Sequence, residues 1–138
     1  MRFMMIYKPA DTKDMEAGVP QTQDEMAKMG KFIEELAKSG VLLATDGLQP
    51  SSKGARVRLA KGKLTVTDGP FTETKELIAG FAIVQVKSKA EAIELAERFL
   101  KLAGDGESEI RLMHDMPAFP RWFHRTRKIQ KEILRCDS

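Results

Sequence analysis

The residues best suited to chemistry form one short polar run, Asp68-Gly69-Pro70-Phe71-Thr72-Glu73-Thr74-Lys75-Glu76. Proline fixes its own φ, lacks an amide donor, and pushes the preceding residue toward extended conformations. The run therefore predicts a stiff loop that holds the Asp68 carboxylate at the end of a strand. A carboxylate held in this way can act as a general base or bind a cation.

Further side chains can share the cleft in which Asp68 would work. Charged residues and one aromatic residue follow it within the loop, and one tyrosine ends the first expected strand. A lysine beside Asp68 would favour the ionised carboxylate, whereas burial would oppose ionisation. We predict Asp68 as the catalytic residue. The ligand-binding residues are predicted to be Tyr7, Phe71, Glu73, Lys75 and Glu76.

Each of these residues also has a purely structural interpretation. Aspartate before glycine commonly forms a turn in which its side-chain oxygen accepts a backbone amide, and Asp68 fits that pattern. Lys75 and Glu76 can form an ion pair that fixes the loop. Tyr7 can be a core tyrosine with a satisfied hydroxyl. The sequence leaves both interpretations open.

Other kinds of catalytic site have weaker support in the sequence. His114 and Asp115 are neighbours at a strand end, where adjacent side chains point to opposite faces, so they make a poor dyad. The two histidines and the single cysteine, Cys136, fit no usual metal-ligand spacing. No phosphate-binding glycine loop and no nucleophile-elbow pattern occurs. We therefore predict neither a metal nor a cofactor.

The elements that must position the loop can be predicted from periodicity and capping. Strands are expected over 2–7, 41–45, 56–59, 63–67, 79–86 and 109–113. Capping boxes at Thr22–Glu25 and Ser88–Glu91 begin two helices, and Gly40 and Gly104 end them. On the second helix, one apolar face is expected to comprise Ala92, Ile93, Ala96, Phe99 and Leu100. Lys61-Gly62 is expected to form a tight turn between the two hairpin strands.

This order of elements, β-α-β, hairpin, β-α-β, predicts a single α+β domain of the split ferredoxin-like kind. Both helices should then cover one face of a sheet. The other face needs cover, because Phe3, Met5 and alternate residues of the central strand would otherwise be exposed. The simplest cover is a second copy of the same sheet, so we predict a homodimer.

The polar run also carries a resemblance to a known family. Together with Ile78-Ala79-Gly80-Phe81 after it and Asp46-Gly47-Leu48-Gln49-Pro50 before it, the run resembles the signature of the YCII-related family, in its DGPF-type branch. The resemblance covers roughly residues 1–113 and implies a dimeric α+β barrel, but little about activity. Other YCII-type members carry a histidine in the first helix, thought to form a dyad with an aspartate. The matching position here is Met29.

The charge is unevenly distributed along the chain. Residues 1–115 carry 17 Lys/Arg and 18 Asp/Glu, whereas residues 116–138 carry 6 and 2. We predict a ferredoxin-like domain over 1–115 and a basic helical extension over 116–138. The chain shows no signal-peptide core and no run of about 18 apolar residues, so a cytoplasmic protein without a membrane partner is expected.

Three functional hypotheses follow. The first is a small-molecule-binding protein with its pocket beside the loop, or a cofactor-independent enzyme doing acid–base, lyase-like chemistry with Asp68 as base. The second is a regulatory protein with a transcription-related partner that contacts the basic extension, because some members of the family resemble proteins encoded beside or fused to sigma factors. The third is a dimer without a ligand. Nucleic acid is not an expected partner.

Overall fold

The computed structural model describes residues 1–114 of the chain. The predicted extension over 116–138, the domain boundary before it, Asp115 and Cys136 lie outside the described residues. The described elements are β1 (Arg2–Pro9), α1 (Lys13–Glu16), α2 (Gln23–Lys38), β2 (Leu42–Gly47), η1 (Ser51–Lys53), β3 (Ala55–Ala60), β4 (Lys63–Asp68), η2 (Thr74–Glu76), β5 (Gly80–Gln85), α3 (Lys89–Ala103) and β6 (Gly106–Leu112). No helix among them is long and apolar enough to span a membrane.

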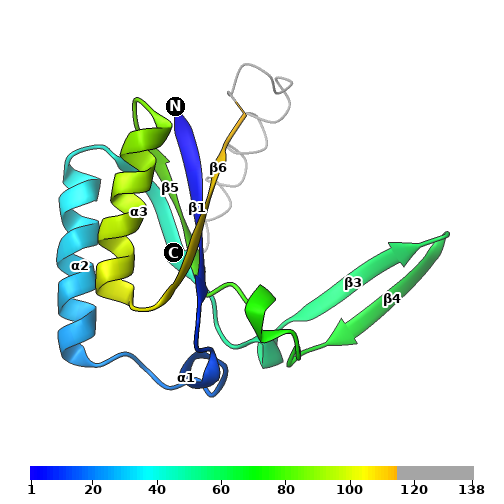
Figure 1. Ribbon diagram of the computed structural model, residues 1–138. Coiled ribbons are helices and arrows are strands. Elements are labelled where there is room, and N and C mark those ends of the chain that lie inside the picture. Colours follow the sequence, from blue (N-terminus) through cyan, green and yellow to red (C-terminus); the bar gives the residue numbers. More distant parts are fainter. Residues whose placement is uncertain (115–138) are drawn as a thin grey trace, which may run out of the picture.

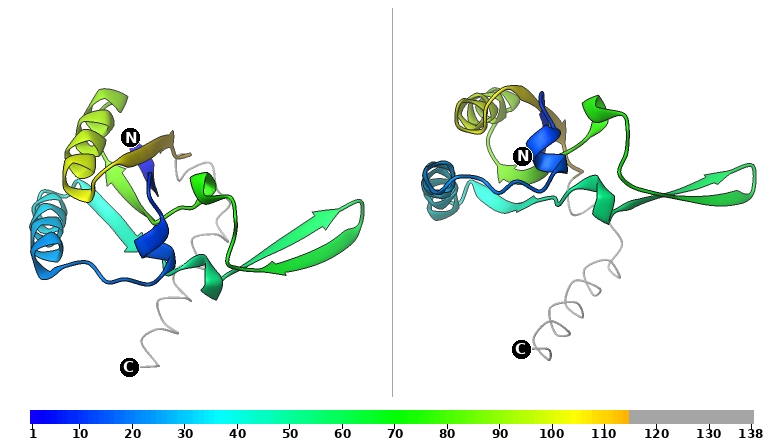
Figure 2. Two further views of the ribbon diagram at one scale, coloured as in Figure 1. Left: turned by 60° about the horizontal axis from the view of Figure 1, so that its bottom comes forward. Right: turned by 90° about the horizontal axis from the view of Figure 1, so that it is seen from below.

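Four strands form an antiparallel sheet in the order β2-β5-β1-β6 (Figure 1). Each of the two long helices connects strands that are not neighbours in this sheet, which is the split ferredoxin-like arrangement. Both α2 and α3 lie on the same face of the sheet (Figure 2). The predicted α+β fold and this placement of the helices are confirmed.

The core lies between the two helices and the sheet. Its residues are Phe3, Met5, Phe32, Leu36, Val84, Val86, Ala92, Leu95 and Ala96. Strand residues alternate between faces, so Met4 and Ile6 on β1 and their cross-strand partners Ile83 and Phe81 point away from the helices. The prediction that Phe3 and Met5 lie on the open face was therefore wrong. They face the helices, and their neighbours Met4 and Ile6 lie on the open face.

The two helix starts differ in their capping. Thr22 and Glu25 form the predicted reciprocal box. At α3 the Ser88 hydroxyl accepts the Glu91 amide at 3.3 Å, but the Glu91 carboxylate accepts the Lys87 amide instead of that of Ser88. The buried face of α3 also differs from the predicted one, because Leu95 is buried and Ile93 is 42% exposed.

The hairpin β3–β4 forms a separate two-stranded sheet that projects from the body of the molecule (Figure 1). Its turn is the predicted pair Lys61-Gly62, with φ values of 51° and 78°. Two consecutive positive φ values match the twist of a two-residue hairpin turn. The predicted hairpin is confirmed, but it stands outside the four-stranded sheet, and the polar loop after it returns the chain to β5.

Candidate functional site

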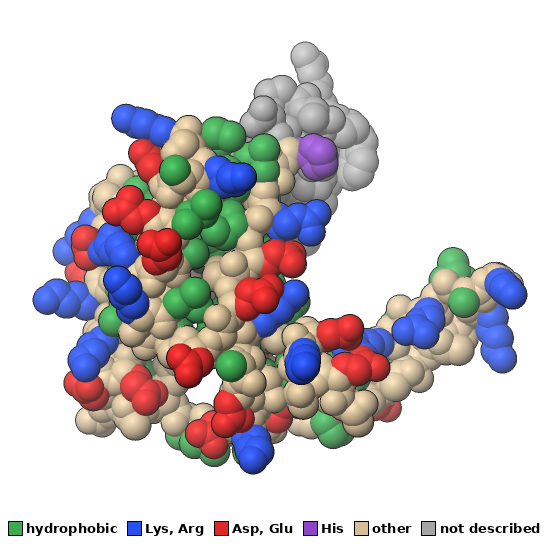
Figure 3. All heavy atoms as spheres, in the orientation of Figure 1, with side chains coloured by type: hydrophobic (Ala, Val, Ile, Leu, Met, Phe, Trp, Pro, Cys, Tyr) green, Lys and Arg blue, Asp and Glu red, His purple; other side chains and the backbone are tan. Residues whose placement is uncertain are grey.

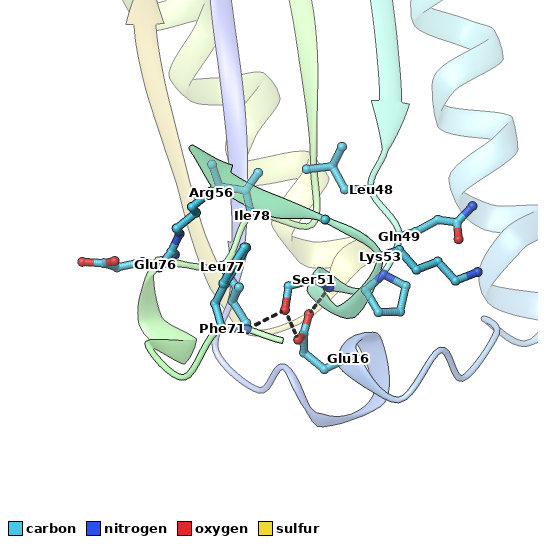
Figure 4. Close-up of a pocket in the computed structure, with 12 residues that line it drawn as sticks. Glu16, Leu48, Gln49, Ser51, Lys53, Arg56, Phe71, Glu76, Leu77 and Ile78 are labelled. Carbon is cyan, nitrogen blue, oxygen red and sulfur yellow. Dashed lines mark hydrogen bonds between the residues drawn. The ribbon is translucent and has the colours of Figure 1, made fainter. Parts of the chain in front are cut away.

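The polar loop packs tightly on the segment around η1. The Gly69 amide donates to the Gly54 carbonyl at 3.0 Å. The Phe71 amide donates to the Ser51 hydroxyl at 3.0 Å (Figure 4). A Cβ atom on Gly69 would lie 1.7 Å from the Ser51 carbonyl oxygen. Only glycine leaves room for this approach of two backbones, so the loop acts first as a structural junction at the base of the hairpin.

Glu16 completes this junction from the end of α1. Its carboxylate accepts hydrogen bonds from the Ser51 hydroxyl and the Ser51 amide, at 2.5 and 2.9 Å. The bond from the side chain and, next, the bond from the backbone lower the pKa of the Glu16 carboxyl group below its ordinary value, against a smaller opposing effect of burial. The ionised form of Glu16 is therefore the form that holds the junction.

The lowered pKa of Glu16 makes the stability of the junction depend on pH. A group whose pKa is lower in the folded state contributes stability above its unfolded-state pKa and loses that contribution as the pH falls through the folded-state pKa. We expect wild type to melt at a higher temperature than Glu16→Gln near neutral pH, and the difference to vanish in acid. Thermal melts of both proteins across this pH range test the point. If the difference in melting temperature stayed constant into acid, it would arise from packing and not from the charge of Glu16.

A groove of about 370 Å³ lies beside this junction. The Arg56 guanidinium sits over the Phe71 ring, 4.0 Å from its centroid, and pairs with the Glu73 carboxylate at 3.0 Å. Glu76 also lines the groove, but its carboxylate points away from Ser51 and Glu16 (Figure 4). Three polar residues of the lining, Glu16, Ser51 and Arg56, are therefore already paired.

The remaining predicted loop residues are not part of the lining of this groove. Asp68 is the last residue of β4; it is exposed and does not line the groove. Its backbone pairs with Ala55 of β3, but its carboxylate has no hydrogen bond or ion pair with residues 1–114, so its side chain does not form the alternative turn either. Lys75 is exposed on η2, and Glu73 takes Arg56 as its partner. The catalytic role of Asp68 stays a prediction.

A second cavity, of about 430 Å³, lies between the sheet and the two long helices. Most of its lining is apolar. The lining residues that matter for its chemistry are Tyr7, Gln21, Met29, Thr45, Asp46, Phe99 and Ser108. Tyr7 was predicted to share a cleft with the polar loop, and the structure places it in this cavity instead. The reason is the alternation of β1, which turns Tyr7 toward the helices with Phe3 and Met5.

Tyr7 is held in this cavity by its neighbours. Its ring meets Phe99 edge to face, with centroids 5.1 Å apart. A Cβ atom on Gly106 would lie 2.9 Å from the Tyr7 ring, so the glycine makes space for the ring. The hydroxyl makes only a long contact of 3.5 Å with the Asp105 carbonyl. Burial and, next, the charge of Asp105 raise the pKa of Tyr7, so its hydroxyl stays protonated at neutral pH.

Ser108 is the functional candidate that the sequence did not suggest. It lies directly opposite Tyr7 in the β1–β6 register, on the same face of the sheet. Its hydroxyl oxygen is buried and has no hydrogen-bond partner among the described residues. The predicted last strand began one residue later, at Glu109, and therefore excluded Ser108. A predicted last strand that began at Ser108 would have placed the Tyr7 and Ser108 hydroxyls side by side.

Two further lining residues bear on the resemblance. Met29, at the position where other YCII-type members carry a histidine, lines this cavity, and so does Asp46 of β2. Thr45 uses its hydroxyl to donate to the Phe81 carbonyl at 2.9 Å. The cavity therefore offers two hydroxyls with spare hydrogen-bonding capacity, Tyr7 and Ser108. Asp46 lies opposite Phe81 in the β2–β5 register, so its carboxylate is on the open face of the sheet.

Comparisons with known proteins agree with the resemblance. The sequence model of the YCII-related domain matches residues 1–116. An uncharacterised protein, R00369 of Rhizobium meliloti (strain 1021), is 35% identical over 74 residues, which are 54% of this chain and 56% of that protein. The matched stretch thus spans little more than half of that relative's length.

Among solved structures, a similar chain is 5-chloro-2-hydroxyhydroquinone dehydrochlorinase from Burkholderia phenoliruptrix AC1100, in complex with 2,5-dihydroxybenzoquinone. The likeness covers 83% of this chain and 96% of that one, at 17% sequence identity and a TM-score of 0.45. A likeness of this degree assigns neither a reaction nor a ligand to this chain.

Proposed function

We propose that this chain, which belongs to the YCII-related family, binds a small uncharged molecule in the cavity between its sheet and its two long helices. The observation that carries the proposal is the buried Ser108 hydroxyl, which has no partner among the described residues. Buried polar groups in native proteins are nearly always hydrogen-bonded. A ligand atom that bonds this hydroxyl would satisfy it, and the spare capacity of Tyr7 supports the same position.

The lining of the cavity limits the class of ligand. It contains no lysine, arginine or histidine, so it offers no cation to a carboxylate or a phosphate. Tyr7 is a neutral donor at physiological pH because its pKa is raised. The apolar lining and a volume toward the lower end of small-molecule sites suit a compact ring. The ligand that fits is a neutral ring bearing a carbonyl or phenolic oxygen.

The acid–base alternative has no base within this cavity. A general base must come within hydrogen-bond reach of the proton that it abstracts. Asp68 lies outside the lining of the cavity. Asp46 lines the cavity, but it lies opposite Phe81 in the β2–β5 register, so its side chain shares the open face of the sheet with Phe81 and Ile6. The lyase-like reaction with Asp68 as base therefore stays a prediction, and the cavity is proposed as a binding site.

Ligand binding is tested by thermal unfolding in the presence of small probes. A molecule that binds only the native state raises the melting temperature. We expect monocyclic phenols and cyclic ketones to stabilise wild type, and benzoate and phenyl phosphate to have no effect. Tyr7→Phe and Ser108→Ala should each weaken binding about tenfold, the loss of one hydrogen bond, while Asp68→Asn binds like wild type.

The same experiment can contradict the proposal in two ways. If no neutral probe stabilises wild type, the cavity is not a site for this class of ligand. If a probe binds and Asp68→Asn abolishes its effect while Tyr7→Phe and Ser108→Ala do not, the site lies beside the polar loop, as the sequence predicted.

The predicted homodimer and the regulatory alternative stay predictions. The open face of the sheet carries Met4, Ile6, Phe81 and Ile83 at its centre, and a second copy that covers them would give the dimeric α+β barrel implied by the resemblance. The regulatory alternative depends on the basic extension, which lies outside the described residues. The comparisons give it no support.

A further inference from the structure

The connection between α1 and α2, residues 17–22, borders the cavity that we propose as the binding site. It contributes Gln21 to the lining. Gln21 is also exposed, so it lies at the mouth of the cavity, where the lining meets solvent. The space-filling view shows an opening at this end of the molecule (Figure 3), in the region where Figure 1 places α1 and the connection that follows it.

The connection is anchored on both sides of Gln21. Before it, the Val19 amide donates to the Asp14 carbonyl at 2.9 Å. After it, Thr22 forms the capping box that begins α2. Pro20 fixes its own φ between these two anchors. The backbone of Gln21 is therefore held at the mouth of the cavity, although it makes no hydrogen bond of its own with residues 1–114.

The side chain of Gln21 has hydrogen-bonding capacity to spare. It has no partner among residues 1–114, and an amide can both donate and accept. The other polar residues of the lining besides Tyr7 and Ser108 are not free in this way. Thr45 donates to the Phe81 carbonyl, and the carboxylate of Asp46 is on the open face of the sheet. Gln21 is therefore the third polar side chain that the cavity offers to a neutral ligand.

The cavity extends across the whole sheet. Its lining reaches from Ser108 on the edge strand β6 to Thr45 on the other edge strand, β2. Four strands are about 14 Å wide, and a hydrogen bond of about 3 Å at each end leaves roughly 8 Å between the polar atoms of a ligand. Apolar side chains, among them Met29 and Ile33, line the space between the two edges. A single ring fills only part of this length.

The two polar ends of the cavity lie under different helices. Ser108 belongs to β6, which contacts α3, whereas Gln21 directly precedes the N-cap of α2, which contacts β2. The ring of a ligand beside Tyr7 and Phe99 would thus leave Gln21 free for a more distant group. The connection and the sheet then bind opposite ends of one molecule.

On the basis of the proposed function, we propose that Gln21 determines the specificity of this site by binding a second polar group of the ligand. The ligand class then becomes narrower. It is an elongated neutral molecule with a phenol or ring carbonyl at one end, an apolar spacer, and a neutral hydrogen-bonding group such as an amide at the other end. The phenol meets Ser108 and Tyr7, and the distal group meets Gln21 at the mouth.

Two phenols of the same shape test this role of Gln21. para-Hydroxyphenylpropanamide and para-isopentylphenol share the ring, the spacer and the arrangement of heavy atoms, but only the first ends in an amide. Calorimetric titration of the full chain measures their dissociation constants. Gln21→Met keeps the length of the side chain and removes its amide. It should weaken binding of the propanamide about tenfold, the loss of one hydrogen bond, and leave binding of isopentylphenol unchanged.

Control variants separate this inference from the proposed function. Gln23→Met changes an exposed glutamine of α2 outside the lining and should bind both probes like wild type. Ser108→Ala should weaken both probes, because both carry the same phenol. If Ser108→Ala weakens binding while Gln21→Met weakens neither probe, or both equally, the role of Gln21 is overturned and the proposed function stands. If neither probe binds wild type, or Ser108→Ala affects neither, both proposals fall.

A second readout follows the side chain of Gln21 directly. Its amide protons are assigned in the nuclear magnetic resonance spectrum by their disappearance in Gln21→Met. The propanamide should shift these signals in wild type, and isopentylphenol should shift them clearly less. Equal shifts with both probes would mean that Gln21 responds to occupation of the cavity and not to the distal group, which would overturn the inference.

Discussion

Replacing Gly69 with alanine is expected to lower the free energy of unfolding by about 3 kcal/mol. The new Cβ atom would lie 1.7 Å from the Ser51 carbonyl oxygen and 2.5 Å from its carbonyl carbon. Both atoms belong to backbone that cannot rotate aside like a side chain, so the loop and η1 must separate. The hydrogen bonds of Gly69 to Gly54 and of Phe71 to Ser51 would be lost with this contact.

The matched control for this substitution is Gly30→Ala. Gly30 lies inside α2, and a Cβ atom there would meet nothing within 4 Å. Alanine is favoured over glycine in a helix interior by about 1 kcal/mol, so this variant should be more stable than wild type. Urea denaturation of the three proteins measures both effects. Equal stability of Gly69→Ala and wild type would mean that the two backbones do not approach as described.

Replacing Phe3 with alanine is expected to lower the free energy of unfolding by about 3–5 kcal/mol, the usual cost of truncating a buried phenylalanine. Phe3 is 3% exposed and lies in the cluster between sheet and helices. A loss of this size is a large part of the total stability of a single domain. The variant therefore tests whether the Phe3 side chain packs against the helices or lies on the open face of the sheet.

Ile6→Ala is the control for Phe3→Ala, because Ile6 belongs to the same strand and points to the other face. Its loss should be clearly smaller, since Ile6 is only partly buried. Urea denaturation of the two variants and wild type measures both losses. Equal losses at the two positions would place the strand one residue out of register.

Much of the fold could be predicted from local patterns. The Thr22–Glu25 box, the glycine that ends α2 and the Lys61-Gly62 turn are short-range features, and the structure contains all three. Which face of β1 meets the helices could not be predicted, because Met4 and Met5 are equally apolar. Hydrophobic alternation gives no phase where both neighbours are hydrophobic.

The candidate site could be predicted only in part. Tyr7 was identified, but it was assigned to the polar loop because both lay at strand ends. Ser108 gave no signal, because a serine in a polar stretch before a strand is ordinary. Its importance depends on the burial of one oxygen atom opposite Tyr7, and burial is a property of packing.

The sequence by itself determined the family, the order of the elements and the stiff loop after the hairpin, because capping, turn chemistry and the composition of the loop act over a few residues. Only the tertiary structure decided that the loop is a junction held by Ser51 and Glu16, that Tyr7 and Ser108 share a cavity, and that the hairpin β3–β4 stands apart from the four-stranded sheet. The physical reason is that each of these depends on which surfaces meet across long sequence separations. Strand register and the alternation of side chains fix those meetings, and they are set by the packing of the whole sheet.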